Sequence, residues 1–270
     1  MPGIAAAGLL DTRTLFRHTL RVDMARMSEE LTANAIVYTY PTGDVDIICA
    51  SDKMFIAPGW EEAGAEPPQR AKRAKGVKSE GEDRERSMRR ARAQLRRLAL
   101  ANDFDYFVTL TLDPAKVDRY DPAAVTKKLN QWCDNMVRRH GLRYVLVPEQ
   151  HRDGAFHFHG FFGGGVKVAD SGHSRGGDCV FNLPQWSLGF STAQRLRGEY
   201  AAAVAYCCKY IGKQNGQRPL GRWYYSGGAL QEPRKEYAAL DYRELKNCGK
   251  AVEFDIPGSK MLVIHTKTEV

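Results

Sequence analysis

The sequence predicts an α+β domain in which helices pack on one side of an antiparallel sheet. Three observations support this class. Residues 104–112 alternate between two sets of side chains, as a strand does. A segment of helical period follows between Asp121 and Gly141, and a second one covers 198–213. The order strand, helix, hairpin, strand, helix between 104 and 213 favours an antiparallel sheet.

A β-hairpin is predicted near the N-terminus. Residues 36–40 and 45–49 are rich in Ile, Val and Tyr, and Pro41 to Asp44 between them form a turn signal. This pattern assigns the hairpin no chemical role.

A basic helix is predicted at 82–100, after a flexible linker at 63–81 that is rich in Gly, Ala, Pro and Lys. Met88, Ala91 and Leu95 recur at helical spacing, so one stripe can pack on a core. Residues 69–100 hold twelve basic and four acidic side chains, which accounts for the whole formal charge of +8. The arginines on the other faces are candidates for contact with a phosphate backbone: Arg89, Arg90, Arg92, Arg96 and Arg97.

The remaining elements follow in order. In the strand at 104–112, Val108 and Leu110 face one side while Phe107 and Thr109 face the other. Asp121 is a good N-cap before Pro122, and Gly141 is a helix stop. Beyond it we predict a strand at 142–149, a strand at 155–162, a glycine-rich loop at 163–178, a strand at 186–191 and a helix at 198–213.

Composition excludes several classes of protein. The 270 residues are 43% hydrophobic and 27% charged, as in an ordinary globular protein, and no apolar run reaches the ~18–20 residues of a membrane span. The first residues lack the basic region of a signal peptide. None of the six cysteines forms a C-x-x-C pair. We therefore expect reduced thiols, a cytoplasmic location and no membrane partner.

The segment Phe156 to Phe162 carries the sharpest local signal. His157 and His159 point to the same face of their strand, which packing explains poorly. A further ligand depends on the hairpin before them: with a three-residue loop Glu149 faces His157, and with a two-residue loop Gln150 does. We favour Glu149 for its charge, while His151 is a weaker competitor. Two histidines and a carboxylate suit Mn²⁺ or Mg²⁺ on a phosphate, and also Zn²⁺.

A second signal lies in the predicted helix at 198–213. Tyr206 and Tyr210 are four residues apart and share a face, and Lys209 and Lys213 form a neighbouring stripe. Alone, this pattern is typical of an amphipathic helix. Beside a metal site, a tyrosine becomes a candidate nucleophile, because a cation can stabilise the phenolate or polarise its target.

Together these segments resemble the HUH endonucleases, in particular the replication initiators of plasmids and single-stranded DNA phages that act by rolling circle. Residues 107–112 resemble the first motif, His157-Phe158-His159 the metal motif, and residues 206–213 the nucleophile motif Y-x-x-K-Y-x-x-K. The resemblance covers about 84–230. It implies a ferredoxin-like, five-stranded antiparallel sheet.

The resemblance also implies roles for residues. His157, His159 and Glu149 would hold Mn²⁺ or Mg²⁺, Tyr210 would be the primary nucleophile and Tyr206 a second tyrosine. Lys213, and more weakly Lys209, would position the phosphate. The reaction would nick and rejoin single-stranded DNA at a replication origin through a covalent 5′-phosphotyrosine, in the cytoplasm of a bacterial host. Because no G-x-x-x-x-G-K-[ST] motif occurs, we expect a separate host helicase and polymerase.

Other functions remain open at this point. A single-strand transposase or a relaxase would use the same chemistry, although relaxases usually have a third histidine. A nucleotide hydrolase or transferase would need a histidine where Phe161 stands. A non-catalytic nucleic-acid-binding protein would use the basic helix and stack bases on Trp223 to Tyr225, although core packing explains these aromatic residues slightly better.

Together these predictions give the domain organisation of the chain. It consists of an N-terminal segment at 1–62, the linker at 63–81, the basic helix at 82–100, a catalytic domain at 101–230 and a C-terminal extension at 231–270. We expect the extension to pack on the catalytic domain or to contact DNA.

Overall fold

A computed structural model describes residues 32–52, 55–56, 80–198, 200–213, 217–247, 251–256 and 259–267. The chain divides into two compact units. One combines Met1–Lys75 with Pro233–Val270, and the other is Gly76–Glu232. Of the predicted linker at 63–81, only the last two residues lie within the described part of the chain, and there they begin a helix.

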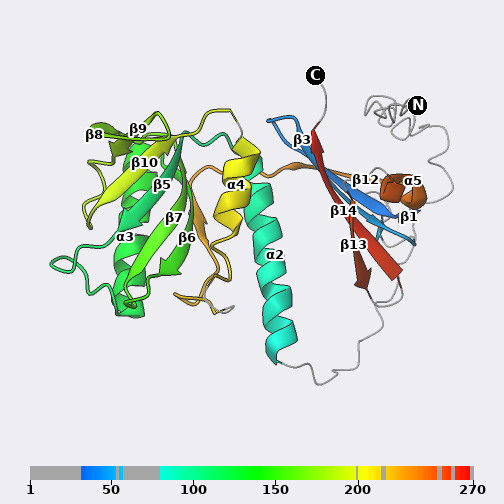
Figure 1. Cartoon of the computed structure of the whole chain (residues 1–270), viewed down its shortest axis with the longest axis horizontal. Coiled ribbons are helices and arrows are strands. Elements are labelled where there is room, and N and C mark those ends of the chain that lie inside the picture. Colours follow the sequence, from blue (N-terminus) through cyan, green and yellow to red (C-terminus); the bar gives the residue numbers. More distant parts are fainter. Residues whose placement is uncertain are drawn as a thin grey trace, which may run out of the picture. The chain divides into compact units, whose positions relative to one another are not determined.

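The unit Gly76–Glu232 contains a seven-stranded sheet with the order β11-β6-β7-β5-β10-β9-β8 (Figure 1). Each neighbouring pair of strands is antiparallel. The α+β class is therefore confirmed, while seven strands replace the five expected. The elements are α2 (Glu80–Leu100), β5 (Tyr106–Thr111), α3 (Pro122–His140), β6 (Arg143–Gln150), β7 (Phe156–Gly163), β8 (Ala169–Arg175), β9 (Asp178–Asn182), β10 (Ser191–Arg195), α4 (Tyr200–Cys208) and β11 (Tyr225–Gly227).

Helices cover both faces of this sheet, not one as predicted (Figure 1). On one face α3 buries Leu129 and Trp132 against Leu110, Phe158 and other strand residues. On the other face α4 brings Tyr206 against Phe107, and α2 packs beside α4. The His-x-His pair lies on this second face, which the pattern of apolar residues had left unassigned.

The ends of α3 agree with the sequence prediction. The side chain of Asp121 accepts a hydrogen bond from the backbone N–H of Ala123, and Pro122 follows as the first helical residue. At the other end Gly141 adopts a left-handed conformation with φ 63°, and its N–H caps the carbonyls of Met136 and Val137.

Two predictions between 163 and 191 are wrong. The expected glycine-rich loop contains β8, which pairs with β9 across Gly176 and Gly177, both at positive φ. That geometry suits a two-residue hairpin turn. The side chains of β8 are mostly exposed, so no apolar alternation marked it as a strand. The strand expected at 186–191 begins only at Ser191, while Trp186 lies before it and packs edge-on against Trp132 at 4.8 Å between ring centroids.

The other unit contains a five-stranded antiparallel sheet of order β12-β2-β3-β14-β13. The predicted hairpin forms its β2 and β3, and strands from the C-terminal extension complete it, a pairing that no sequence pattern had predicted. The elements are β1 (Thr32–Ala33), β2 (Ala35–Thr39), β3 (Asp44–Ala50), β4 (Phe55–Ile56), β12 (Arg234–Ala238), α5 (Tyr242–Asn247), β13 (Ala251–Ile256) and β14 (Ser259–Lys267). None of the helices in the described ranges combines the length and apolar composition that a membrane crossing needs.

Candidate active site

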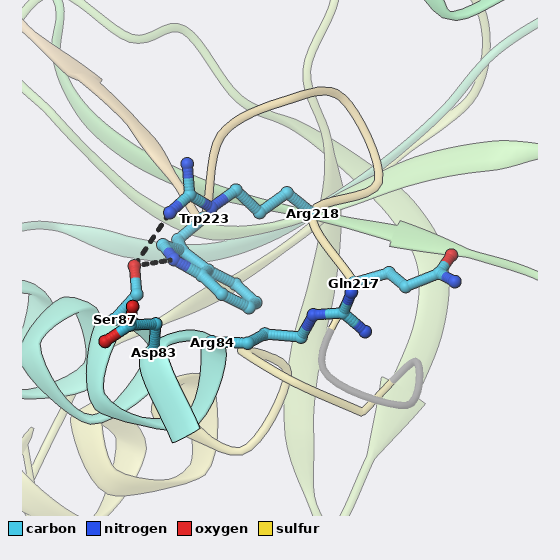
Figure 2. A pocket seen from close by; sticks show the side chains of 6 residues that line it. All are labelled: Asp83, Arg84, Ser87, Gln217, Arg218 and Trp223. Carbon is cyan, nitrogen blue, oxygen red and sulfur yellow. Dashed lines mark hydrogen bonds between the residues drawn. The ribbon is translucent and has the colours of Figure 1, made fainter. Parts of the chain in front are cut away.

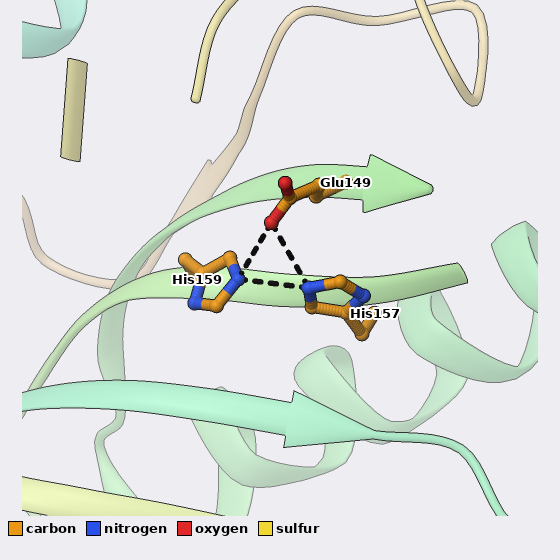
Figure 3. Close-up of side chains that lie close together, drawn as sticks. All are labelled: Glu149, His157 and His159. Atoms are coloured by element: carbon orange, nitrogen blue, oxygen red, sulfur yellow. Dashed lines mark hydrogen bonds and ion pairs between the residues drawn. The ribbon is translucent and has the colours of Figure 1, made fainter. Parts of the chain in front are cut away.

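The hairpin of β6 and β7 places Glu149 directly opposite His157. Its loop is Arg152-Asp153-Gly154: the N–H of His151 donates to the carbonyl of Ala155, and Gly154 has φ 89°. This is the three-residue loop that favours Glu149 over Gln150, and the left-handed position suits glycine. His157 and His159 then lie beside Glu149 on one face of the sheet (Figure 3).

Three buried ligand atoms converge at this point. Glu149 Oε2 lies 3.0 Å from His157 Nε2 and 2.9 Å from His159 Nε2, and the two nitrogens are 2.8 Å apart. Two ligands at right angles on an octahedral ion with bonds of ~2.1 Å would be about 3.0 Å apart. The cluster of two imidazoles and one carboxylate could therefore hold a divalent metal ion.

The charges of the cluster suit metal binding. Burial, followed by the neighbouring His157, lowers the pKa of His159 to about 4, and burial with His151 lowers the pKa of His157. Burial alone would raise the pKa of Glu149, but the hydrogen bond from Lys213 and the two histidines outweigh it and lower that pKa. Neutral imidazoles and an ionised carboxylate are the forms that coordinate metals.

Thr109 orients one of the ligands, which sequence reasoning missed. Thr109 lies opposite His159 in the pairing of β5 with β7, and its Oγ1 is 3.1 Å from His159 Nδ1. In the tautomer in which Nδ1–H donates to Thr109 Oγ1, the lone pair of Nε2 is directed at the cluster. The alternation of residues 104–112 predicted that Thr109 lies on this face of the strand, but it did not predict that Thr109 pairs with His159.

His151 is not part of the converging set. Its ring lies 3.8 Å from the ring of His157, centroid to centroid, yet the group of ligand atoms that meet consists of Glu149, His157 and His159. The third ligand in this arrangement is thus a carboxylate.

Tyr210 lies directly against the cluster. Its ring stacks on His159 with centroids 4.0 Å apart and planes at 17°. Its hydroxyl donates to the hydroxyl of Tyr206 at 2.8 Å, and Tyr206 is 47% exposed. Burial, and then the hydrogen bond to Tyr206, raise the pKa of Tyr210, so its phenol is protonated at neutral pH. A nearby cation is needed to stabilise a phenolate here.

Lys213 links the tyrosine to the cluster. Its Nζ lies 2.6 Å from Glu149 Oε1 and 5.0 Å from the centroid of the Tyr210 ring. Lys209 is exposed, and within the described residues the ion pairs of Glu149 are with His157, His159 and Lys213. Of the two predicted lysines, the structure brings only Lys213 to the cluster.

Residues 105–215 match the family Replication-associated protein ORF2/G2P. This match confirms the resemblance to the replication initiators. The matched segment includes the Glu149, His157 and His159 cluster, both tyrosines and Lys213, and excludes α2. No curated protein and no solved structure matches the chain.

The turn that carries Tyr210 departs from the predicted helix. The helix α4 ends at Cys208, and residues 209–213 continue as turns with hydrogen bonds such as that from Tyr210 N–H to the carbonyl of Cys207. Gly212 then has φ 85°, and a Cβ there would lie 2.0 Å from Met88 Sδ of α2. The prediction of helix to residue 213 is wrong: tighter turns, in which N–H groups bond the carbonyl three residues before them, replace the α-helix after Cys208, and the left-handed Gly212 lies at their end.

The five arginines of α2 that were predicted to contact DNA fall into three groups. Arg89 and Arg90 are exposed, and Arg89 makes an exposed 3.5 Å ion pair with Glu85. Arg96 and Arg97 are partly buried. Arg92 instead donates from Nε and Nη2 to the carbonyl of Ile211, at 3.0 and 2.6 Å. That the five arginines contact DNA stays a prediction, and the structure adds that two donors of Arg92 serve the turn beside Tyr210.

Proposed function

We propose that this chain is a replication initiator that nicks and rejoins single-stranded DNA at an origin, with Tyr210 as the nucleophile. The match of residues 105–215 to a replication-associated family supports a role in replication. The single observation that carries the chemistry is the stacking of Tyr210 on His159, 4.0 Å apart, because it sets a nucleophile beside a cluster suited to a metal.

The proposal gives each residue a step. Glu149, His157 and His159 would hold Mn²⁺ or Mg²⁺, which supplies Lewis-acid polarisation of the scissile phosphate. Tyr210 Oη would attack phosphorus, forming the Oη–P bond while the bond from phosphorus to the 3′-oxygen breaks. The phenol loses its proton and the 3′-oxygen gains one. The products are a 5′-phosphotyrosine and a free 3′-OH that can prime synthesis.

Two neighbouring residues would support this attack. Lys213 balances negative charge near the phenol and keeps Glu149 ionised. The hydroxyl of Tyr206 accepts a hydrogen bond from the hydroxyl of Tyr210, which orients that phenol. An exposed Tyr206 could also attack a second phosphodiester, forming its own Oη–P bond and releasing a 3′-OH. That 3′-oxygen would then attack the phosphotyrosine at Tyr210, which restores a phosphodiester and returns the Tyr210 phenol. We also propose that the sheet and helices of this unit form the ferredoxin-like fold of the HUH endonucleases. A separate host helicase and polymerase would act with the protein.

The test is a covalent adduct assay with labelled single-stranded oligonucleotides of candidate origins and Mn²⁺ or Mg²⁺. We expect an adduct that is stable in denaturing gels and absent with a chelator or in Tyr210→Phe. Tyr206→Phe should keep the first adduct and weaken rejoining. If Tyr206→Phe alone abolished the first adduct, the nucleophile assignment would be wrong. Binding without any adduct would indicate the non-catalytic class instead.

A further inference from the structure

A pocket of about 520 Å³ lies between the first turns of α2 and the segment that follows the Tyr210 turn (Figure 2). Its lining is Asp83, Arg84, Ser87, Gln217, Arg218 and Trp223. We propose that this pocket binds one nucleotide of the single-stranded DNA that flanks the cleaved phosphate. This inference rests on the proposed function and adds a second point of contact with the same strand.

The back of the pocket is fixed by hydrogen bonds to one hydroxyl. Ser87 Oγ accepts from Arg218 Nη2 at 2.8 Å and from Trp223 Nε1 at 3.0 Å, which Figure 2 shows as dashed lines. The guanidinium of Arg218 also lies over the Trp223 ring, 5.4 Å from its centroid. Because Trp223 is only 9% exposed, it forms a rigid support for this guanidinium.

This support prepares Arg218 to bind an anion. Holding an arginine in place before binding reduces the entropy lost when a ligand arrives. Ser87 takes up one of the five N–H donors of the guanidinium, so the planar fork keeps donors for two oxygens of a phosphate.

The second arginine reinforces the positive charge. Arg84 is exposed and has no ion pair with any residue in the described ranges. Asp83 is the single carboxylate in the lining, against two guanidinium groups. A phosphodiester, singly negative and with two free oxygens, matches this charge and these donors.

The volume and surfaces fit a base as well as a phosphate. Pockets of ~300–1,000 Å³ hold small organic ligands, so one nucleotide is of suitable size. Bases stack on arginine planes and aromatic rings in proteins that bind single strands. The amide of Gln217 at the rim can donate to and accept from the edge of a base.

The pocket is close to the candidate active site along the chain. Lys213, which contacts Glu149, precedes Gln217 by four residues, which span at most about 14 Å. Successive nucleotides of a stacked strand advance by ~3.4 Å. The backbone of Gln217 therefore lies within about four such steps of the backbone of Lys213.

The first measurement is the fluorescence of Trp223 during titration with deoxythymidine 5′-monophosphate in the presence of a chelator. We expect quenching that is lost in Trp223→Phe and in the double variant R84A/R218A. Thymidine and inorganic phosphate should each bind at least about tenfold more weakly than the nucleotide, since each lacks one half of the contacts. Equal affinity for inorganic phosphate would reduce the site to an anion site and overturn the nucleotide assignment.

The second measurement is the affinity for a labelled oligo(dT) strand over a range of salt concentrations. R84A/R218A should lose about tenfold in affinity and reduce the salt slope by about 1.4, the value for two contacts on a single strand. The matched control R89A/R90A removes two exposed arginines of the same helix. It should leave the quenching by the nucleotide unchanged. If R84A/R218A and R89A/R90A had equal effects on quenching and on affinity, the assignment of nucleotide binding to this pocket would be wrong.

These measurements separate this inference from the proposed function. Binding of the nucleotide requires neither metal nor Tyr210. Quenching without any covalent adduct would refute the nicking chemistry and support nucleotide binding in the pocket. An adduct without quenching would support the nicking chemistry and refute nucleotide binding in the pocket.

Discussion

The guanidinium of Arg92 donates two hydrogen bonds to the main-chain oxygen of Ile211, the residue that follows Tyr210. Because Tyr210 stacks on His159, this contact connects α2 with the position of the candidate nucleophile over the metal cluster. A basic helix that the charge pattern assigned to DNA binding therefore also supports the reactive turn.

The first prediction concerns Arg92→Gln. We expect the rate of adduct formation at saturating DNA to fall by about 10- to 100-fold, because a displacement of the nucleophile of about 1 Å costs on this order. Single-turnover kinetics over a range of DNA concentrations measures it. Arg92→Lys should not restore the rate, since one ammonium cannot reproduce two donors from a planar fork.

The matched control is Arg90→Gln, which removes an exposed arginine from the same helix. It should lower DNA affinity and the salt slope, and leave the rate at saturation unchanged. An Arg92→Gln variant that changed only the affinity would show that Arg92 is a DNA contact like its neighbour.

The second prediction concerns Gly212→Ala. Its φ of 85° costs an L-residue about 1–2 kcal/mol, and the added Cβ would meet Met88 Sδ. We expect a loss of at least about 2 kcal/mol in the free energy of unfolding, measured with urea. Met88→Ala in the same chain should recover the part due to the clash, and the conformational part should remain. Full recovery would mean that the left-handed backbone costs nothing here.

Local signals predicted the parts of the fold that depend on few neighbours in sequence. Asp121 and Gly141 define the ends of α3 because capping is a property of adjacent residues. The register of Glu149 and His157 follows from a three-residue loop that ends in Gly154. The ends of α3 were predicted from the sequence, whereas the sequence left a two-residue and a three-residue loop open and favoured Glu149 for its charge.

Contacts between distant segments could not be read in this way. The hydrogen bond from Arg92 to Ile211 joins residues 119 positions apart, and the sequence around an arginine in a basic segment does not predict such a partner. The same holds for Thr109 and His159, whose pairing depends on the register of β5 against β7. The C-terminal strands likewise join β3 through β14, a pairing that no turn links.

The third prediction concerns Thr109→Val, which keeps the shape of the side chain and removes its oxygen. The affinity for Mn²⁺ should fall by about 10- to 100-fold, as for other partners that orient a metal-bound histidine. Calorimetric titration with the metal alone measures it, and Thr109→Ser should retain most of the affinity. The control Thr111→Val alters the same strand opposite His157. An equal loss in Thr111→Val would attribute the effect to the strand, not to the hydrogen bond.

The fourth prediction concerns the alkaline stability of the core beneath the sheet. Burial raises the pKa of the Cys133 thiol to about 12, and burial also raises the pKa of Tyr144 beside it. In the unfolded chain these groups lose their protons at about pH 9 and 10, so between these values and the folded pKa the native state binds more protons than the unfolded one. The free energy of unfolding should therefore fall as pH rises above about 9.

Cys133→Ala should make this fall less steep by up to about 1.4 kcal/mol per pH unit, the effect of one proton. Urea denaturation at a series of pH values measures both slopes. The exposed Cys179 provides the control, since Cys179→Ala should leave the slope unchanged, and parallel slopes for wild type and Cys133→Ala would show that Cys133 titrates alike in both states.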